Sequence, residues 1–343
     1  MIENPFTLTF GEKPELIIER IETRDSIIKQ LTSKHPSSRV FMLTGIRGSG
    51  KTVLLTSISK KISEDKNRKT IDLNSSSSSI LNDFSSYLYN DAEFKKMFIE
   101  AKIGFSVFGV NLSFEIQKEK PSYQVLIEEM LEKYVERNKK ILITIDEVSN
   151  NNQIREITSL VQILIRKGFP IFLIMTGLYK NIDDLQNSKD LTFLYRAEKI
   201  FLKNLDIAQV NKKYQSVFND EKLSKDMATL TKGYPYAFQT LGYLMFDSKD
   251  KSIDKVLDDF DFRLGEYVYR KIYSELSTLE KEIVKIVSNN VDISTSELAS
   301  KLNKEPNLVS NYKNILIKKG ILNDEYGKFV FALPRFNEYL KLI

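Results

Sequence analysis

The chain has 343 residues, of which 42% are hydrophobic and 28% charged, so it can bury a sizeable core and is long enough for two or three domains. Its formal net charge of +5 permits a nucleic-acid partner but does not argue for one. The absence of cysteine and the single histidine, His35, exclude disulfides, thiolate nucleophiles and zinc sites built on histidine and cysteine. Because His35 lies in the polar turn SKHPSSR, we expect it to be a solvated loop residue. Phosphate chemistry, which uses glycine, lysine, threonine and carboxylates, stays open.

No segment has the pattern of a targeting signal or a membrane span. The opening MIENPFTLTF lacks a basic stretch ahead of an apolar one, so no signal peptide is expected. The most apolar segments, such as IFLIM at 171–175, have the length of strands and fall well short of the ~18 residues that span a bilayer. The sequence therefore predicts a cytoplasmic protein that does not use a membrane.

The pattern from residue 1 to about 205 alternates strands with helices. Apolar, partly β-branched stretches predict strands, and apolar residues at helical spacing predict helices. The predicted strands cover 39–45, 69–74, 140–148, 170–177 and 198–205. The predicted helices cover 52–62, 80–100, 121–138 (with Pro121 in its first turn) and 154–168, and a β-hairpin is predicted at 103–116. This alternation implies the α/β class, with a parallel sheet and helices on both faces.

Two further patterns follow. Residues 206–273 are all-helical, apart from a break at KGYPYAF. The last part predicts helices at 278–290, 294–302 and 307–319, then two short strands around the turn DEYG. Ser294 and Glu297 form a capping box at the second of these helices. Three helices and a hairpin are the pattern of a winged helix-turn-helix. The predicted domains are therefore 1–205, 206–273 and 274–343.

The stretch GIRGSGKT at 45–52 is typical of a loop that binds phosphate. Gly45, Gly48 and Gly50 allow the backbone N–H groups to wrap closely around an anion, and the following helix directs its positive end toward the same anion. Lys51 can reach the β- and γ-phosphates, and Thr52 can place its hydroxyl on Mg²⁺. The predicted strand before it and helix after it are the context that the motif requires. The residues expected to contact the nucleotide here are Gly45, Ile46, Arg47, Gly48, Ser49, Gly50, Lys51, Thr52 and Val53.

Polar residues at three further places complete the expected site. ILITIDEV ends a predicted strand in Asp146, which can hold Mg²⁺, and Glu147, which can polarise the attacking water. The next strand ends in Thr176, which we expect between the two flanking strands, where it can orient the water; the alternative is a local hydrogen bond. Arg196 precedes the last strand and offers a rigid fork for phosphate oxygens, in trans if the chain assembles; the alternative is a solvated surface charge.

These motifs, in this order and spacing, resemble those of AAA+ ATPases. The helical region and the C-terminal pattern make the whole chain similar to the replication-initiator-like clade of origin-recognition type, and to bacterial relatives of unknown role. The resemblance implies a P-loop NTPase core, a helical lid and a winged helix. It also implies Lys51 as the Walker A lysine, Thr52 and Asp146 at the metal, Glu147 as catalytic base, Thr176 as sensor 1 and Arg196 as an arginine finger.

The sequence departs from this family pattern at the lid. Many AAA+ lids carry a sensor-2 arginine, but the corresponding segment, TKGYPYAFQTLGYL, has none. Its Gly233-Tyr234-Pro235 instead resembles the G-x-P signature of STAND-type signalling ATPases, which implies a nucleotide contact at Pro235.

The C-terminal pattern leaves two roles open. Exposed polar side chains are expected on the third helix, and amides and lysine can meet base edges and phosphates. These residues are Asn307, Ser310, Asn311, Lys313 and Asn314. The net charge of residues 278–343 is only +2, which is weak for a DNA-binding module, so packing against protein is the alternative.

The sequence therefore predicts a protein that binds ATP and Mg²⁺ and hydrolyses ATP to ADP and phosphate, and whose nucleotide state controls the C-terminal module. The C-terminal module is expected to bind double-stranded DNA or, as the alternative, a protein partner, and a homo-oligomer is a further open possibility for the chain. One alternative is a nucleotide-gated switch with little or no turnover. Another is a DNA-binding regulator in which ATP only supports the fold.

Overall fold

A computed structural model describes residues 3–8, 15–103, 122–290, 293–325 and 328–343. Apart from Ile103, the hairpin predicted at 103–116 lies outside these residues. The chain divides into two compact units. The sheet unit comprises Arg20–Thr44 and Thr52–Ile200, and the carboxyl-terminal unit comprises Met1–Glu19, Gly45–Lys51 and Phe201–Ile343. The domain boundaries at 205 and 273 stay a prediction.

The sheet unit is built on five strands, as predicted. The strands are β1 (Val40–Thr44), β2 (Arg68–Leu73), β3 (Lys140–Ile145), β4 (Ile171–Gly177) and β5 (Glu198–Phe201). Their order is β2-β3-β4-β1-β5, and β2, β3, β4 and β1 pair in parallel. All residues of β1 and β4 are buried, as expected for a parallel sheet covered on both faces. Because β4 lies between β1 and β3, residues that follow these three strands meet at one edge of the sheet.

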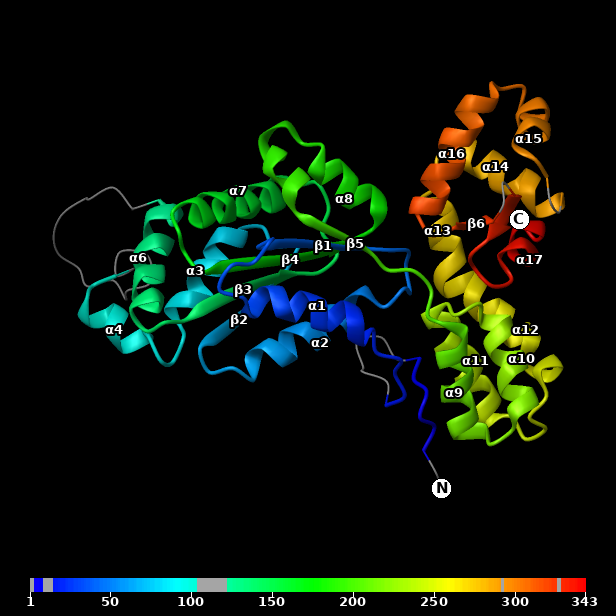
Figure 1. The fold of residues 1–343 in the computed structure, drawn as a ribbon, viewed down its shortest axis with the longest axis horizontal. Helices are drawn as coiled ribbons and strands as arrows, with labels where there is room; N and C mark the ends of the chain where they lie inside the picture. Colours follow the sequence, from blue (N-terminus) through cyan, green and yellow to red (C-terminus); the bar gives the residue numbers. More distant parts are fainter. Residues whose placement is uncertain (1–2, 9–14, 104–121, 291–292, 326–327) are drawn as a thin grey trace. The chain divides into compact units, whose positions relative to one another are not determined.

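Helices cover the sheet on both faces, and Figure 1 shows α1 and α2 on one face and α7 on the other. The helices of this unit are α1 (Ile21–Thr32), α2 (Lys51–Ser63), α3 (Ile80–Tyr89), α4 (Lys95–Glu100), α6 (Tyr123–Glu136), α7 (Asn152–Arg166), α8 (Tyr179–Gln186) and the 3₁₀ segment η1 (Lys189–Arg196). Helix α1 was not predicted.

Two predicted helices differ in detail from the structure. The segment 80–100 is broken between α3 and α4, because Asn90 and Asp91 use their side chains on nearby backbone groups. Helix α6 begins at Tyr123 and not at Pro121, because Ser122 is its N-cap and accepts a hydrogen bond from the backbone N–H of Val125.

The carboxyl-terminal unit is mostly helical. Its first helices are α9 (Ile207–Phe218), α10 (Glu221–Thr231), α11 (Pro235–Asp247), α12 (Ile253–Leu264), the π-helical segment η2 (Gly265–Tyr269) and α13 (Arg270–Ser274). Then follow α14 (Thr278–Asn289), α15 (Thr295–Leu302), α16 (Pro306–Lys318), the antiparallel strands β6 (Leu322–Glu325) and β7 (Lys328–Phe331), and α17 (Phe336–Lys341). The capping box of Ser294 and Glu297 is present at α15. The three helices and the hairpin occur in the predicted order, and their assignment as a winged helix stays a prediction.

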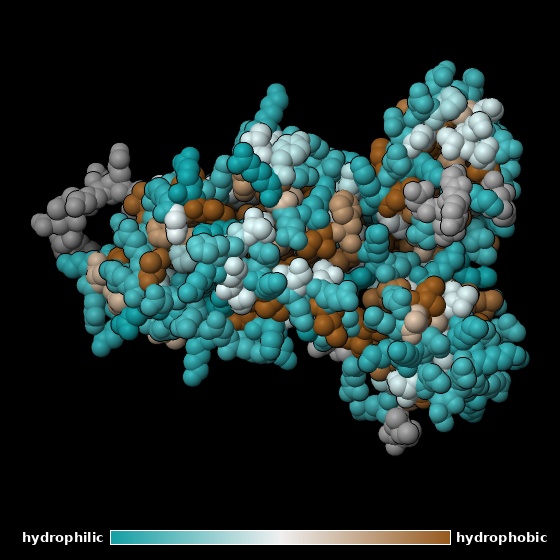
Figure 2. Space-filling view, viewed as in Figure 1, coloured by the Kyte–Doolittle hydropathy of each residue, from teal (hydrophilic) through white to brown (hydrophobic). Residues whose placement is uncertain are grey.

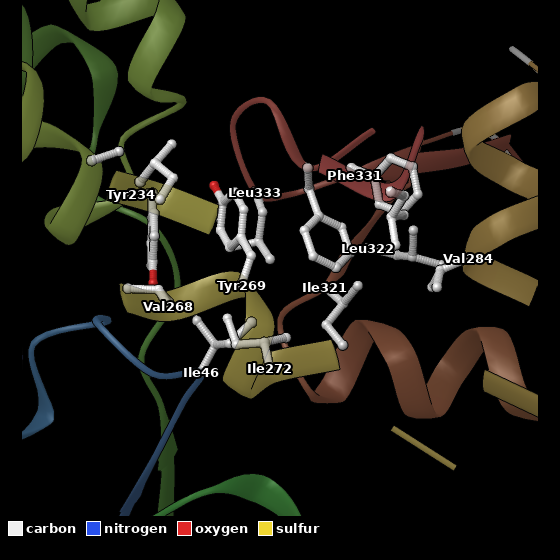
Figure 3. Close-up of a cluster of buried hydrophobic side chains, with 14 of the residues drawn as sticks. Ile46, Tyr234, Val268, Tyr269, Ile272, Val284, Ile321, Leu322, Phe331 and Leu333 are labelled. Atoms are coloured by element: carbon white, nitrogen blue, oxygen red, sulfur yellow. The ribbon is translucent and has the colours of Figure 1, made fainter. Parts of the chain in front are cut away.

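One hydrophobic cluster runs through the carboxyl-terminal unit, from Phe6 to Leu340. Figure 3 shows its central part, where Ile46 lies near Val268 and Ile272. Ile46 is 7% exposed, so part of the glycine-rich loop contributes to this core.

The face of the molecule shown in Figure 2 is mainly polar. Hydrophobic residues gather only in small groups on the face shown in Figure 2. None of the helices in the described ranges has the length and apolar character needed to cross a membrane.

Candidate functional site

The glycine-rich loop connects β1 to α2 and has the backbone that its glycines allow. Gly48 and Gly50 have φ of +71° and +87°, values that favour glycine. The Lys51 side chain folds back over the loop, where its Nζ donates to the carbonyl oxygens of Gly45 at 2.9 Å and Ile46 at 3.0 Å. Helix α2 begins at Lys51 and has no acidic residue in its first turn, so its positive end is open to an anion. The loop is thus suited to bind phosphate.

The same loop is held by residues of the carboxyl-terminal unit. The hydroxyl of Tyr234 donates to the carbonyl oxygen of Arg47 at 2.5 Å. The Arg47 guanidinium pairs with Glu275, at 3.0 Å for Nη2 and 3.2 Å for Nε. A Cβ added at Gly320 would lie 3.5 Å from the Cβ of Ile46. The shape of the loop therefore depends on residues far along the chain.

Asp146 is the centre of a second group of contacts, in the sheet unit. Its Oδ2 accepts a 2.6 Å hydrogen bond from the Thr52 hydroxyl, and its Oδ1 accepts from the Thr176 hydroxyl. The backbone N–H of Glu147 donates to Asp146 Oδ1 at 3.0 Å and to Thr176 Oγ1 at 3.2 Å. The structure thus brings together Thr52 in the first turn of α2, Asp146 directly after β3 and Thr176 near the end of β4.

Glu147 directly follows Asp146 and has an unusual backbone. Its side chain is exposed, and its φ is +53°, in the left-handed region that non-glycine residues rarely adopt. Such strain is found more often at functional sites than elsewhere.

Thr52 and Asp146 fit a Mg²⁺ ion, because hydroxyl and carboxylate oxygens are its preferred ligands and it usually takes only one or two protein carboxylates beside phosphate and water. Within the described ranges, no group of three or more histidine, aspartate or glutamate side chains could hold a metal by itself.

Other residues singled out in the sequence lie apart from these contacts. Arg196 is exposed at the end of η1, and its side chain makes no hydrogen bond or ion pair with any described residue. His35 is exposed, as expected. Val53 is 40% exposed on α2, and Pro235 is partly buried at the first position of α11.

One expectation for the C-terminal helices was wrong. Asn307, Ser310, Asn311 and Asn314 are exposed on α16, but Lys313 is only 7% exposed. Its Nζ lies 5.1 Å from the centre of the Phe329 ring on β7, so the lysine covers an aromatic side chain.

The sequence did not point to Tyr234 or Glu275 as partners of the loop. Tyr234 stands in the Gly233-Tyr234-Pro235 segment, where the resemblance drew attention to the proline. Burial raises the pKa of the Tyr234 phenol, so its hydroxyl stays protonated and can donate at neutral pH.

Two family models match the chain. Residues 20–177 match the KAP family P-loop domain, and residues 266–340 match a domain of unknown function (DUF8462). A search of the curated proteins finds no match.

Solved structures are similar over nearly the whole chain. The Walker-type ATPase of Pyrococcus abyssi is 17% identical with a TM-score of 0.66, and the match covers 98% of this chain and 99% of that one. The ORC2 protein of Aeropyrum pernix, solved as ADPNP–ADP complexes, is 13% identical with a TM-score of 0.55, and the match covers 97% and 96% of the two chains. Residues 20–177 therefore have the fold of a P-loop NTPase domain, and the chain as a whole has a fold similar to those of the Walker-type ATPase and the ORC2 protein.

Proposed function

We propose that this chain is a Mg²⁺-dependent ATPase that cleaves ATP to ADP and phosphate. The observation that carries the proposal is the meeting of the Thr52 hydroxyl with the Asp146 carboxylate, directly after a loop built to bind phosphate. A structural strand-to-helix turn does not need a buried lysine and a threonine–aspartate pair at this place. The ADPNP–ADP complexes of the A. pernix protein support adenine nucleotides as the ligand.

Each residue has a distinct task in this proposal. The backbone N–H groups of the loop and the Lys51 ammonium bind the β- and γ-phosphates. Thr52 and Asp146 would hold Mg²⁺, which neutralises charge on the phosphate oxygens when it is bound. Glu147 orients the attacking water and accepts its proton. Thr176 holds the Asp146 carboxylate in place from the neighbouring strand.

The proposal includes control of the C-terminal module, for which we keep the predicted division into a core at 1–205, a lid at 206–273 and a winged helix at 274–343. Its support is the pairing of the loop residue Arg47 with Glu275, and the closeness of Gly320 to Ile46, where an added Cβ would be in van der Waals contact. A phosphate that reshapes the loop would change these contacts and bias the module between two arrangements. Double-stranded DNA is the proposed partner of the exposed polar face of α16.

Steady-state phosphate release tests the proposal. Wild-type protein is measured with ATP and MgCl₂ over a range of protein concentrations, with and without duplex DNA, beside Glu147→Gln. We expect turnover by the wild type, a loss of about 100-fold or more in Glu147→Gln, and unchanged ATP binding by that variant. Turnover that rises with protein concentration and falls in Arg196→Ala would support a role of Arg196 in trans.

Two results would contradict the proposal. Equal turnover by the wild type and Glu147→Gln would remove Glu147 from the mechanism. Tight ATP binding without phosphate release under any of these conditions would favour the alternative of a nucleotide-gated binding protein. The feature of the sequence that favours this alternative is the absence of an arginine from the segment 231–244.

A further inference from the structure

The hydroxyl of Tyr234 contacts the glycine-rich loop. Tyr234 is the N-cap residue of α11 and is fully buried. A buried phenol needs an acceptor for its proton, and this one uses the carbonyl oxygen of Arg47 at 2.5 Å. The contact therefore ties the start of α11 to one particular peptide group of the loop.

The hydrogen bond from Tyr234 fixes the direction of the Arg47 carbonyl and also that of the following Gly48 N–H. None of the described peptide bonds is cis, and in a planar trans peptide the C=O and the following N–H point in opposite directions. When the Arg47 carbonyl points at Tyr234, the N–H of Gly48 must point away from Tyr234. Gly48 N–H is one of the loop donors that a bound phosphate would use.

The fit between Tyr234 and the loop is close. A Cβ at residue 48 would lie 2.5 Å from the Tyr234 hydroxyl oxygen and 2.8 Å from the Cβ of Tyr236, distances that real Cβ atoms do not reach. Gly48 also has a positive φ. The Tyr234 side chain thus packs so closely against the loop that only glycine fits at position 48.

Tyr234 itself is held firmly. Its N–H donates to the carbonyl oxygen of Thr231 at 2.9 Å, and the carbonyl of Gly233 accepts from the Leu205 N–H at 2.7 Å. Glu275 pairs with the side chain of Arg47 at 3.0 Å. The Arg47–Gly48 peptide is therefore restrained both through its carbonyl and through the arginine side chain.

We propose that Tyr234, assisted by Glu275, is a positioning residue that aims the Gly48 N–H at the phosphates of a bound nucleotide. This inference rests on the proposed function, because it assigns a task within the same nucleotide site. The ligand part that it concerns is the polyphosphate and not the base.

The test uses Tyr234→Phe in the full chain, which removes the hydroxyl and keeps the ring. Tyr214→Phe is the matched control, because Tyr214 is also fully buried in the carboxyl-terminal unit and donates to a backbone carbonyl, that of Phe238, at 2.7 Å. Dissociation constants for Mg-ATP and for inorganic tripolyphosphate are measured by calorimetry, and the midpoint of thermal unfolding is measured for each protein.

We expect Tyr234→Phe to weaken binding of both Mg-ATP and tripolyphosphate by about tenfold, because one loop donor is no longer aimed. Tyr214→Phe should lower the midpoint of thermal unfolding about as much as Tyr234→Phe does. It should leave both dissociation constants at their wild-type values. Equal dissociation constants for the two variants would overturn the positioning role. If the wild type bound neither ligand, the proposed function would fail, and this inference with it.

A second variant keeps the test available if Tyr234→Phe does not fold. Glu275 is partly exposed, so Glu275→Gln should leave the fold intact while it weakens the hold on Arg47. We expect tripolyphosphate binding to fall about threefold in this variant. Unchanged binding in a folded Glu275→Gln protein would also contradict the proposal.

Discussion

The hydroxyl of Thr52 donates a 2.6 Å hydrogen bond to the carboxylate of Asp146, 94 positions further along the chain. The pair forms because β1 and β3 both flank β4, so the residues that follow them meet at one sheet edge. Thr176, at the end of β4, completes the group from the middle. The arrangement joins Thr52, which directly follows the phosphate-binding loop in sequence, to the carboxylate of Asp146, so two hard oxygen ligands lie together.

The first prediction concerns the metal. Asp146→Asn should remove most of the increase in ATP affinity that Mg²⁺ provides, because the variant keeps the shape of the carboxylate and loses its charge. We expect ATP affinity in MgCl₂ to fall at least tenfold, toward the value measured in EDTA. Calorimetric titrations with MgCl₂ and with EDTA measure this change. Asp72→Asn is the control, because Asp72 also accepts a threonine hydroxyl, that of Thr144; a similar loss there would argue against a specific metal ligand.

The second prediction concerns the backbone of Glu147. Since its φ of +53° is costly for glutamate, Glu147→Gly should raise the free energy of unfolding by about 1 kcal/mol and abolish ATP turnover. Urea unfolding and phosphate release measure the two effects. Lys102→Gly is matched to it, because Lys102 is exposed in the same unit with a φ of +55°, and it should gain stability without any change in turnover. A destabilised Glu147→Gly protein would show that the conformation is not strained.

The third prediction concerns α16. Asn311 and Asn314 are exposed on it, so the double variant Asn311→Ala/Asn314→Ala should bind duplex DNA about tenfold more weakly and unfold at the wild-type temperature. Fluorescence anisotropy over a salt series measures the affinity. Ser300→Ala, on the exposed side of α15, serves as control. If the double variant bound as well as the wild type, a protein-binding role for the module would be favoured.

The fourth prediction concerns a buried ion pair. Lys319 Nζ lies 2.6 and 2.7 Å from the two carboxylate oxygens of Glu280, which is only 2% exposed. Lys319→Met should lower the free energy of unfolding by about 3 kcal/mol, because it leaves a buried charge without its partner. The double variant Lys319→Met/Glu280→Gln should recover much of this loss in urea unfolding. The exposed neighbour provides the comparison: Lys318→Met should change little, and a loss equal to that of Lys319→Met would refute the ion-pair explanation.

The phosphate loop and the carboxylates could be predicted from the sequence because their signals are local. Spaced glycines, Lys51 and Thr52 occur in one stretch, and Asp146 directly follows an apolar strand. The position of Thr176 followed from the expectation that it lies between two flanking strands, and the strand order bears this out.

The contact of Tyr234 with Arg47 could not be predicted, because it joins residues 187 positions apart through packing that no local pattern encodes. The burial of Lys313 was missed for a similar reason, since Phe329 on β7 decides which face of α16 is covered. The break after α3 and the start of α6 depend on polar side chains that compete for backbone hydrogen bonds.

The membership of Gly45–Lys51 in the carboxyl-terminal unit has a consequence for how the chain can be divided. The phosphate-binding motif is contiguous in sequence, but the side chains that support it belong to the region after residue 201. A fragment that ended at residue 205 would keep every residue of the motif and lose both Tyr234 and Glu275. A fragment that contains the whole motif therefore still lacks the residues that give the motif its shape, and a folded phosphate site requires the region after residue 201 as well.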